Sequence, residues 1–283
     1  MTNRSDAPAP PALRPTPAHV RAWRAARVTV HLFEGLATTT LVFPMLRPPA
    51  RRRLIRRWSG RLLRMLAVEA RVYGELPSAG GNLLVVSNHV SWLDIFVLHS
   101  VQPVRFIAKS DLARWPLAGR LIRDTGTLFV ERERRRDTHR VNRQAADALA
   151  SGDVVAVFPE GTTTDGTTML PFKSSLLQPI VDAAGHVLPV AIRYRAADGA
   201  LSTAPAYDGA KSIADSFRAI VRERRLVVEL HLAAPLPASA MHRRELTQAA
   251  ETAVRDALGL PAAERGTDPA AGPATRPGVG AAT

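Results

Sequence analysis

The segment 87–94, SNHVSWLD, places a histidine and an aspartate five residues apart. An imidazole can take up a proton near neutral pH, and a carboxylate can orient it, so His89 and Asp94 could form a general base and its partner. In a regular helix five residues turn about 500°, which points the two side chains ~140° apart. The pair can therefore meet only if the chain bends between them.

The sequence around this pair predicts such a bend. The apolar run 83–86 predicts a strand that ends near Asn88, and a helix is expected to begin near Trp92. His89 would then lie at the carboxyl end of a strand, where open α/β sheets place their ligand sites. The alternative is that His89 is a hydrogen-bonded residue at the end of a strand and that Asp94 only favours the start of the helix.

A second stretch, 154–166, reads VVAVFPEGTTTDG and predicts a buried strand followed by a polar loop. Backbone amides, threonine hydroxyls and the carboxylate of Glu160 could hold a polar head group there. An ordinary turn between a strand and the next element would have the same composition.

Several kinds of chemistry lack their residues. The chain has no cysteine, which excludes disulfides, thiolate metal sites and a cysteine nucleophile. It has no G-x-S-x-G, Walker, dinucleotide-binding or H-E-x-x-H motif, and its eight histidines do not cluster. We therefore expect no metal, no resident cofactor and no acyl-enzyme. A base in this chain would act on a hydroxyl that belongs to the substrate.

Four motifs together resemble the glycerolipid acyltransferases, the family of the lysophosphatidic acid acyltransferases. NHVSWLD resembles their first signature, in which four residues separate the histidine from the aspartate. GTLFVER (126–132), FPEGTT (158–163) and LPV (188–190) resemble the second, third and fourth signatures, in the same order. The stretches 106–119 and 170–177 are also similar, so the resemblance covers roughly residues 80–195.

This resemblance implies a reaction and a role for each matching residue. His89 would be the general base and Asp94 its orienting partner, and the acyl group would come from a thioester of coenzyme A or acyl carrier protein. The resemblance further implies an acceptor site. Arg132 would bind the phosphate of the acceptor, and Lys109 would add positive charge nearby. The remaining residues, Glu160, Gly161 and Thr162, would form the acceptor-binding loop.

The acceptor is less closely defined than the reaction. We expect first the sn-2 hydroxyl of 1-acyl-sn-glycerol 3-phosphate, which would give phosphatidic acid. Many family members that make phosphatidic acid carry arginine after Glu-Gly-Thr, whereas this chain has Thr163. The stretch also resembles lyso-ornithine lipid acyltransferases, which provide the second hypothesis. A non-catalytic basic protein that binds membranes or nucleic acid is the hypothesis from a different class.

Positive charge is concentrated near the N-terminus. Residues 1–75 contain 14 arginines and four acidic residues, which accounts for +10 of the net charge of +13. The apolar run 28–46 predicts a short, tilted or half-buried membrane helix, or else a helix packed on a soluble domain. The basic amphipathic helix expected over 51–66 follows directly and favours an anionic lipid surface over nucleic acid. We expect the protein at the cytoplasmic face of the inner membrane.

The order of elements predicts an α/β fold with a mainly parallel central sheet flanked by helices. Strands are expected over 82–87, 104–108, 128–130, 154–158, 187–193 and 226–232. Helices are expected over 92–101, 112–123, 138–151, 174–184, 212–223 and 240–258. The predicted organisation is a disordered N-terminus (1–17), basic membrane-associating helices (18–75), an acyltransferase domain (76–260) and a disordered tail (261–283).

Overall fold

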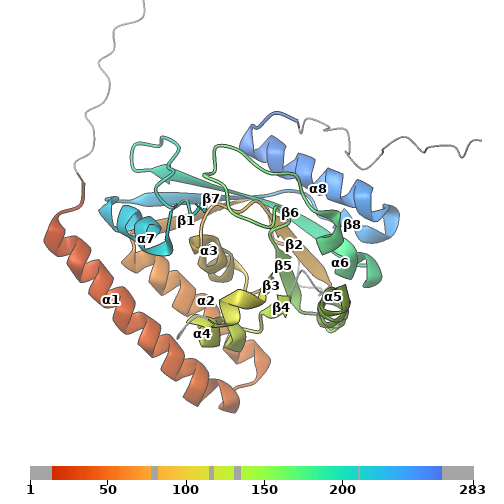
Figure 1. Cartoon of the computed structure of the whole chain (residues 1–283), viewed down its shortest axis with the longest axis horizontal. Helices are drawn as coiled ribbons and strands as arrows, with labels where there is room; N and C mark the ends of the chain where they lie inside the picture. The colour runs from red at the N-terminus through yellow and green to blue at the C-terminus, as the bar shows by residue number, and fades with distance from the viewer. Residues whose placement is uncertain (1–14, 78–81, 115–117, 131–134, 210, 263–283) are drawn as a thin grey trace, which may run out of the picture.

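The computed structural model describes residues 15–77, 82–114, 118–130, 135–209 and 211–262 of the chain. In these residues eight strands form one sheet, which lies at the centre of the molecule (Figure 1). Its order is β1-β7-β6-β2-β5-β3-β4, with β8 beside β6. The strands are β1 (Val68–Tyr73), β2 (Leu83–Ser87), β3 (Arg105–Lys109), β4 (Leu128–Val130), β5 (Val154–Val157), β6 (His186–Ala196), β7 (Leu226–Leu232) and β8 (Leu236–Pro237).

Most neighbouring strands are parallel. Strands β6, β2, β5, β3 and β4 all run in one direction, and β7 turns back antiparallel to β6 with β1 parallel beside it. The predicted mainly parallel sheet is therefore confirmed. Strand β1 was not predicted, because VEARVY lies at the edge of the sheet and half of it is exposed. The sheet thus begins before residue 76, within the segment assigned to membrane-associating helices.

The helices match the predicted segments closely, with three exceptions. The helix expected over 28–46 begins ten residues earlier, at Ala18. The segment predicted as one helix over 112–123 contains a 3₁₀ turn (Ser110–Arg114) and α4 (Ala118–Asp124), and the segment 174–184 contains a 3₁₀ turn (Ser174–Leu177) and α6 (Gln178–Asp182). The predicted disordered ends lie outside the described residues except for 15–17 and 261–262. The remaining helices are α1 (Ala18–Ala37), α2 (Pro48–Met65), α3 (Leu93–Val101), α5 (Arg135–Ala150), α7 (Ile213–Arg222) and α8 (Arg243–Leu258).

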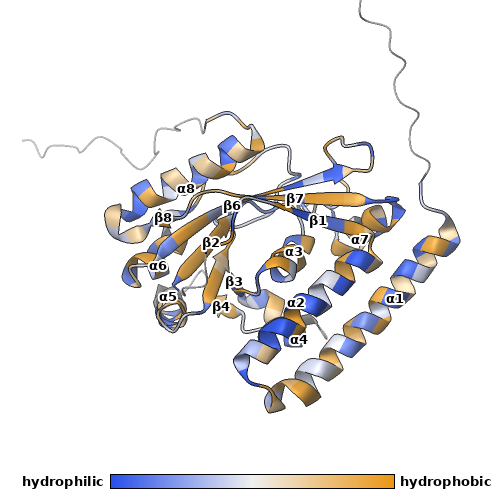
Figure 2. Cartoon of the chain, turned by 180° about the vertical axis from the view of Figure 1, so that it is seen from behind, coloured by the Kyte–Doolittle hydropathy of each residue, from blue (hydrophilic) through white to orange (hydrophobic). Residues whose placement is uncertain are grey.

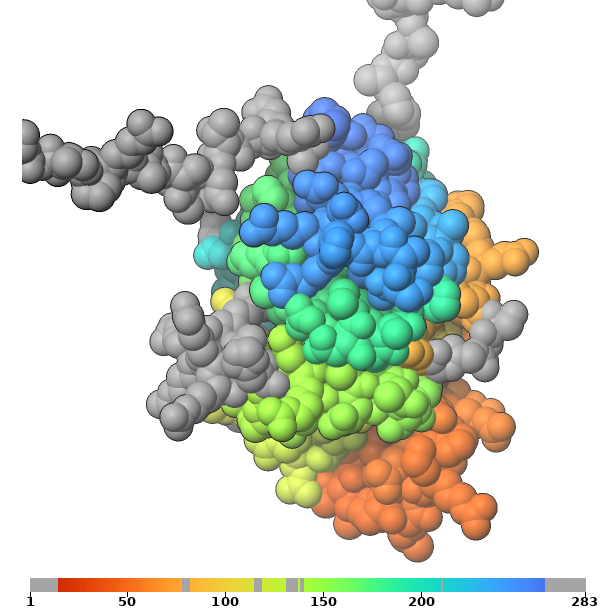
Figure 3. Space-filling model, turned by 90° about the vertical axis from the view of Figure 1, so that its right-hand side faces the viewer, coloured from red at the N-terminus to blue at the C-terminus, as the bar shows by residue number. Residues whose placement is uncertain are grey.

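Helices cover both faces of the sheet. Leu83 and Val85 of β2 pack into a core shared with α2, α3 and α7, whereas Leu84 and Val86 pack into a core shared with α5, α6 and α8. Figure 3 shows the outside of the second layer, where α8, α6 and α5 lie one below the other. Because a strand sends alternate side chains to opposite faces, burial on both faces requires the continuous apolar run seen in β2.

The N-terminal helices form a pair. Helix α1 continues through a π-helical turn (Thr38–Val42) and a 3₁₀ turn (Phe43–Met45), and this 28-residue stretch is long and apolar enough to cross a membrane by length and composition. His31 and Glu34, which interrupt the apolar run, face α2. His31 Nε2 lies 3.0 Å from the carbonyl oxygen of Trp58, and Arg61 donates to Glu34 at 2.7 Å.

The outer side of α1 carries an apolar stripe. Its members share one helical face and are between 56% and 84% exposed, and we call them the α1 stripe: Trp23, Val30, Phe33, Leu41 and Met45. Figure 2 shows apolar segments along α1 beside the hydrophilic arginine-rich α2. Helix α1 is therefore packed on the domain along one face and leaves a second apolar face outside it.

Candidate active site

The bend between β2 and α3 is built by Asn88. Its side-chain amide donates to the carbonyl oxygen of Ile192 at 2.9 Å, and the N–H of Ile192 donates to the Asn88 side-chain oxygen at 2.7 Å. The side chain thus adds one more rung to the ladder between β2 and β6 after the backbone of β2 has turned away. This arrangement places His89 in the turn and lets α3 begin at Leu93.

The turn brings His89 and Asp94 into contact, as the sequence predicted. His89 Nδ1 lies 2.8 Å from Asp94 Oδ2, and the side chains are 19% and 0% exposed. The same oxygen accepts from the backbone N–H groups of Val90 at 2.8 Å and Ser91 at 2.9 Å. Asp94 therefore orients His89 and also binds the backbone amides just before α3. It thus acts both as the partner of the imidazole and as a residue that favours the start of the helix.

The second nitrogen of His89 is left for chemistry. Because Nδ1 faces a carboxylate, which accepts hydrogen bonds, the neutral ring carries its proton on Nδ1 and leaves Nε2 as an acceptor. Within the described part of the chain Nε2 makes no hydrogen bond. The ring stacks on Phe158 with centroids 3.9 Å apart and an interplanar angle of 7°. This stacking and the Asp94 contact hold the imidazole in one orientation.

Glu160 was predicted to form the acceptor-binding loop together with Gly161 and Thr162, and its side chain lies beneath that loop. Its carboxylate is buried and accepts from the N–H of His89 at 2.7 Å and from the N–H of Leu170 at 2.8 Å. Burial, the main cause, raises the pKa of Glu160 to about 7, although both amides act in the opposite direction. Both oxygens bind the backbone of the protein, so Glu160 holds the loop in place, and its role in binding an acceptor stays a prediction.

The rest of this loop lies beside His89. Gly161 adopts a φ of 78°, which suits glycine, and its N–H donates to the carbonyl oxygen of Phe158 at 3.0 Å. Thr162 is exposed, Thr163 donates its hydroxyl to the carbonyl oxygen of Tyr207, and the N–H of Thr164 donates to the carbonyl oxygen of His89 at 2.9 Å. The loop is thus joined to the backbone of residues 88–92 between β2 and α3, which we call the catalytic turn after its predicted role.

The two predicted cationic residues follow neighbouring strands. Lys109 ends β3, is exposed, and pairs in register with Val130 of β4. Because β3 and β2 are both parallel to β5, their carboxyl ends lie on the same side of the sheet. Lys109 therefore lies on the same side as His89. Arg132 lies outside the described residues, two positions after Val130.

Two supporting groups escaped the sequence analysis. The hydroxyl of Tyr194, on β6, donates to Asp94 Oδ1 at 2.6 Å. On α8, the buried pair of Glu251 and Arg255 binds the segment after the loop: Glu251 accepts from the N–H of Phe172 at 2.9 Å, and Arg255 donates to the carbonyl oxygen of Met169 at 2.9 Å. These hydrogen bonds join residues that are 79 to 100 positions apart, and local sequence patterns do not predict such contacts.

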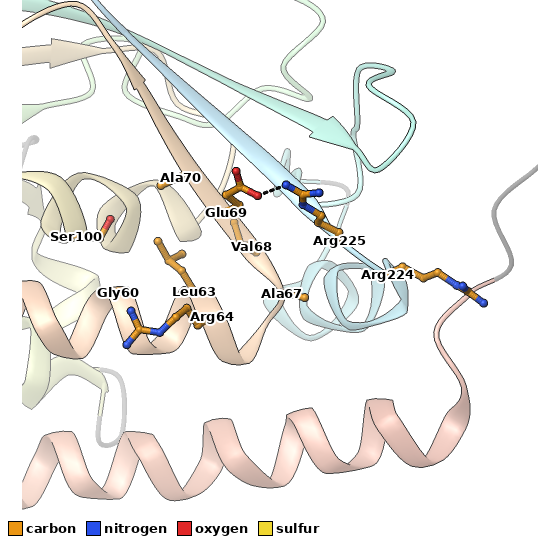
Figure 4. Close-up of a pocket in the computed structure, with 10 residues that line it drawn as sticks. All are labelled: Gly60, Leu63, Arg64, Ala67, Val68, Glu69, Ala70, Ser100, Arg224 and Arg225. Carbon is orange, nitrogen blue, oxygen red and sulfur yellow. Dashed lines mark hydrogen bonds and ion pairs between the residues drawn. The ribbon is translucent and has the colours of Figure 1, made fainter.

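A cavity of about 570 Å³ lies elsewhere, between α2, β1 and the start of β7. Figure 4 shows its charged lining, in which Arg225 pairs with Glu69. Its lining residues include none from 87–94 or 158–166. In the described residues no group of three His, Asp or Glu side chains is placed to hold a metal ion. The candidate active site is therefore the catalytic turn and the loop beside it.

Comparison with known proteins identifies the family. A family model described as Acyltransferase matches residues 69–193. A lyso-ornithine lipid O-acyltransferase of Pseudomonas aeruginosa is 38% identical over 210 residues, which cover 74% of this chain and 80% of that protein. The chain belongs to the acyltransferase family.

Other relatives of this acyltransferase carry a different name. A 1-acyl-sn-glycerol-3-phosphate acyltransferase of Neisseria meningitidis is 38% identical over 160 residues, or 56% of this chain and 63% of that protein. The crystal structure of the 1-acyl-sn-glycerophosphate acyltransferase PlsC from Thermotoga maritima matches with a TM-score of 0.65 at 23% identity, over 85% of this chain and 94% of that one. The predicted family and fold are confirmed, and the relatives differ in the acceptor that they name.

Proposed function

We propose that this acyltransferase moves a fatty acyl group from a thioester of coenzyme A or acyl carrier protein to the hydroxyl of a lysolipid. The observation that carries the proposal is the 2.8 Å contact between His89 and the buried Asp94, which leaves Nε2 without a partner in the described residues. A base of this kind needs a hydroxyl to act on, and the acceptor supplies it.

The steps balance without a covalent enzyme intermediate. Nε2 of His89 takes the proton of the acceptor hydroxyl while the hydroxyl oxygen attacks the carbonyl carbon of the thioester. The negative charge of Asp94 stabilises the imidazolium that forms. The tetrahedral intermediate then collapses, the carbon–sulfur bond breaks, and the imidazolium returns the proton to the departing thiolate. The products are an ester and a free thiol.

Of the two acceptors, two observations favour lyso-ornithine lipid over lysophosphatidic acid, which the sequence analysis placed first. The relative named for lyso-ornithine lipid matches 74% of this chain, against 56% for the relative named for 1-acyl-sn-glycerol 3-phosphate. Thr163 stands where many phosphatidate-forming members have arginine, and its hydroxyl is bound to Tyr207. A neutral residue there offers a phosphate no counter-charge.

Lysophosphatidic acid is the second candidate acceptor, and cationic residues support it. Lys109 is exposed at the edge of the sheet that carries His89, and Arg132 follows the neighbouring strand in the sequence. Either side chain would bind a phosphate or the carboxylate of an ornithine head group. Gly161 and Thr162 would line the head-group side of the loop, with Glu160 holding that loop in place from below.

The acceptors are membrane lipids, and we propose that the helix pair α1–α2 holds the enzyme at the cytoplasmic face of the inner membrane. The α1 stripe supplies apolar side chains that nothing in the described structure covers. The adjacent α2 contains seven arginines, and Arg47 precedes it as its N-cap residue. Apolar and cationic surfaces side by side favour an anionic bilayer over nucleic acid.

An assay with both acceptors tests the proposal. The purified full-length protein is given a radiolabelled acyl thioester and equal amounts of lyso-ornithine lipid and lysophosphatidic acid, with the His89→Ala protein as the inactive control. We expect most of the label in the ornithine lipid. Label only in phosphatidic acid would overturn the choice of acceptor, and no transfer above the control to either lipid would overturn the reaction class.

A further inference from the structure

Asp94 has two oxygens with different partners. Oδ2 faces His89 and the two amides of the catalytic turn, as described above. In the described part of the chain, Oδ1 accepts one hydrogen bond, from the hydroxyl of Tyr194 at 2.6 Å. Asp94 is 0% exposed and Tyr194 is 2% exposed. With no route for bulk water to this carboxylate, the tyrosine is the donor that satisfies its second oxygen.

Strand β6 explains how Tyr194 reaches this place. The last register pair between β2 and β6 joins Ser87 to Val190, and the side chain of Asn88 continues the ladder to Ile192. Beyond that point β6 stays extended because it pairs with β7, where Tyr194 is opposite Val228. Tyr194 therefore projects from a strand held on its far side, over the start of α3, and its hydroxyl has a fixed position.

We propose that Tyr194 is a positioning residue of the transfer reaction, which sets both the orientation of Asp94 and the proton affinity of the His89–Asp94 pair. The inference rests on the proposed function of that pair. Tyr194 acts through Asp94, and no hydrogen bond joins it to the imidazole in the described residues. A hydrogen bond to a buried carboxylate stabilises its charged form, so it weakens the hold of the carboxylate on the imidazole proton.

In the described residues, few titratable groups lie around Asp94. His89 faces it from the turn and Tyr194 from β6, and the charge of Asp94 acts on Glu160 in the loop after β5. From α7, Ser216 binds the indole of the neighbouring Trp92 and adds no charge. Burial, followed by the charge of Asp94, raises the pKa of Tyr194 well above its usual value, so its hydroxyl stays protonated as a donor.

The test is Tyr194→Phe, which removes one oxygen and keeps the ring. With one donor fewer, the pair holds its proton more tightly, so the acid limb of the pH profile of kcat/KM moves to higher pH by at least about 0.5 unit. We expect kcat to fall about 10-fold, with the KM of both substrates within about 2-fold of the wild-type values. Tyr73→Phe, on the edge strand β1, is the matched control and leaves the profile unchanged. An unshifted acid limb in an active Tyr194→Phe enzyme overturns the inference.

A second measurement does not depend on turnover. The midpoint of the His89 imidazole titration, followed by NMR in ¹⁵N-histidine-labelled protein and assigned with His89→Ala, also moves up in Tyr194→Phe. If wild-type protein transfers no acyl group but the midpoint still moves, the proposed function fails, and only the effect of Tyr194 on the proton affinity of the His89–Asp94 pair stands. If the enzyme is active and the midpoint does not move, the role of Tyr194 fails alone.

A third variant covers the case in which Tyr194→Phe does not fold. Fluorotyrosine is incorporated into a Tyr73→Phe/Tyr207→Phe protein, in which Tyr194 is the one remaining tyrosine of the three in the sequence. Its more acidic phenol donates more strongly, so the midpoint of His89 moves to lower pH, opposite to the Phe variant. A midpoint that stays in place or rises contradicts the proposal.

Discussion

Two of the pairs of a histidine and a nearby carboxylate in the described residues behave differently, although each histidine contacts its carboxylate through Nδ1. In the helix pair α1–α2, His31 Nδ1 lies 3.3 Å from Glu34 Oε2, and the ring stacks on Trp58. In the catalytic turn, His89 Nδ1 lies 2.8 Å from Asp94 Oδ2, and the ring stacks on Phe158. Each imidazole is thus held by a carboxylate and by an aromatic ring.

The second nitrogen separates the two pairs. His31 Nε2 lies 3.0 Å from the carbonyl oxygen of Trp58, and its side chain is 1% exposed, so no substrate can reach it. His89 Nε2 has no partner in the described residues, and its side chain is 19% exposed. One histidine joins two helices, whereas the other can accept a proton. A histidine beside a carboxylate becomes a base only when its other nitrogen is left accessible.

The largest expected effect tests this difference directly. His89→Ala should lower turnover by at least ~10²-fold, because the hydroxyl of the acceptor loses its general base. The matched variant His31→Ala should keep turnover within about 2-fold in a detergent-dispersed assay and should lower the melting temperature, because it removes contacts between α1 and α2. Initial rates and thermal unfolding of both variants provide the measurement. A His89→Ala enzyme that keeps its activity would contradict the proposed mechanism.

The second prediction concerns the outer side of the helix pair. Phe33→Glu/Leu41→Glu places two charges in the α1 stripe and should reduce the fraction bound to anionic vesicles at least ~10-fold, since each charge must leave water. Val72→Glu/Leu201→Glu adds the same charge at exposed apolar positions away from α1 and should bind as the wild type does. Vesicle flotation measures both.

Substitution is a sharper test here than removal of the helices. Leu62, Leu63 and Leu66, at the end of α2, are buried in the core of the domain, so deleting residues 1–66 would unfold more than the membrane surface. If the Phe33→Glu/Leu41→Glu protein floats with vesicles as well as the wild type, another surface binds the membrane.

The last prediction concerns the stability of the fold and the carboxylate of Glu160 beneath the loop. Because burial raises the pKa of Glu160 from 4.5 to about 7, the folded protein keeps a proton that the unfolded chain releases between these values. This contribution to stability is complete below pH 4.5 and is lost as the pH rises through 7. It amounts to at most ~3 kcal/mol.

Denaturant unfolding between pH 4.5 and 8 measures it. Glu160→Gln should flatten the fall in stability over this range, and Glu75→Gln, at an exposed position, should leave the fall unchanged. Parallel pH profiles for the wild type and Glu160→Gln would show that Glu160 does not titrate in this window.

Much of this protein follows from the sequence alone, because the relevant signals are local. Apolar runs and helical periodicity depend on neighbouring residues, and they predicted the α/β class, most strands of the sheet and the strand-to-helix bend at Asn88. The bend made a contact of His89 with Asp94 possible, which no regular helix allows, and the resemblance to the acyltransferase motifs predicted it. The spacing of arginines and apolar residues over 51–66 likewise predicted the basic helix α2.

The remaining features depend on contacts between distant residues, and tertiary structure decided them. Edge strand β1 exists because β7 pairs with it more than 150 residues later. Glu160 accepts a hydrogen bond from the backbone of His89, 71 residues earlier in the chain, and Tyr194 donates one to Asp94, 100 residues earlier. His31 is a polar residue within the apolar run 28–46, and it contacts Trp58 of α2 because the fold pairs α1 with α2. A side chain's type limits which hydrogen bonds it can make, but the fold determines which partners lie within reach and whether water can compete.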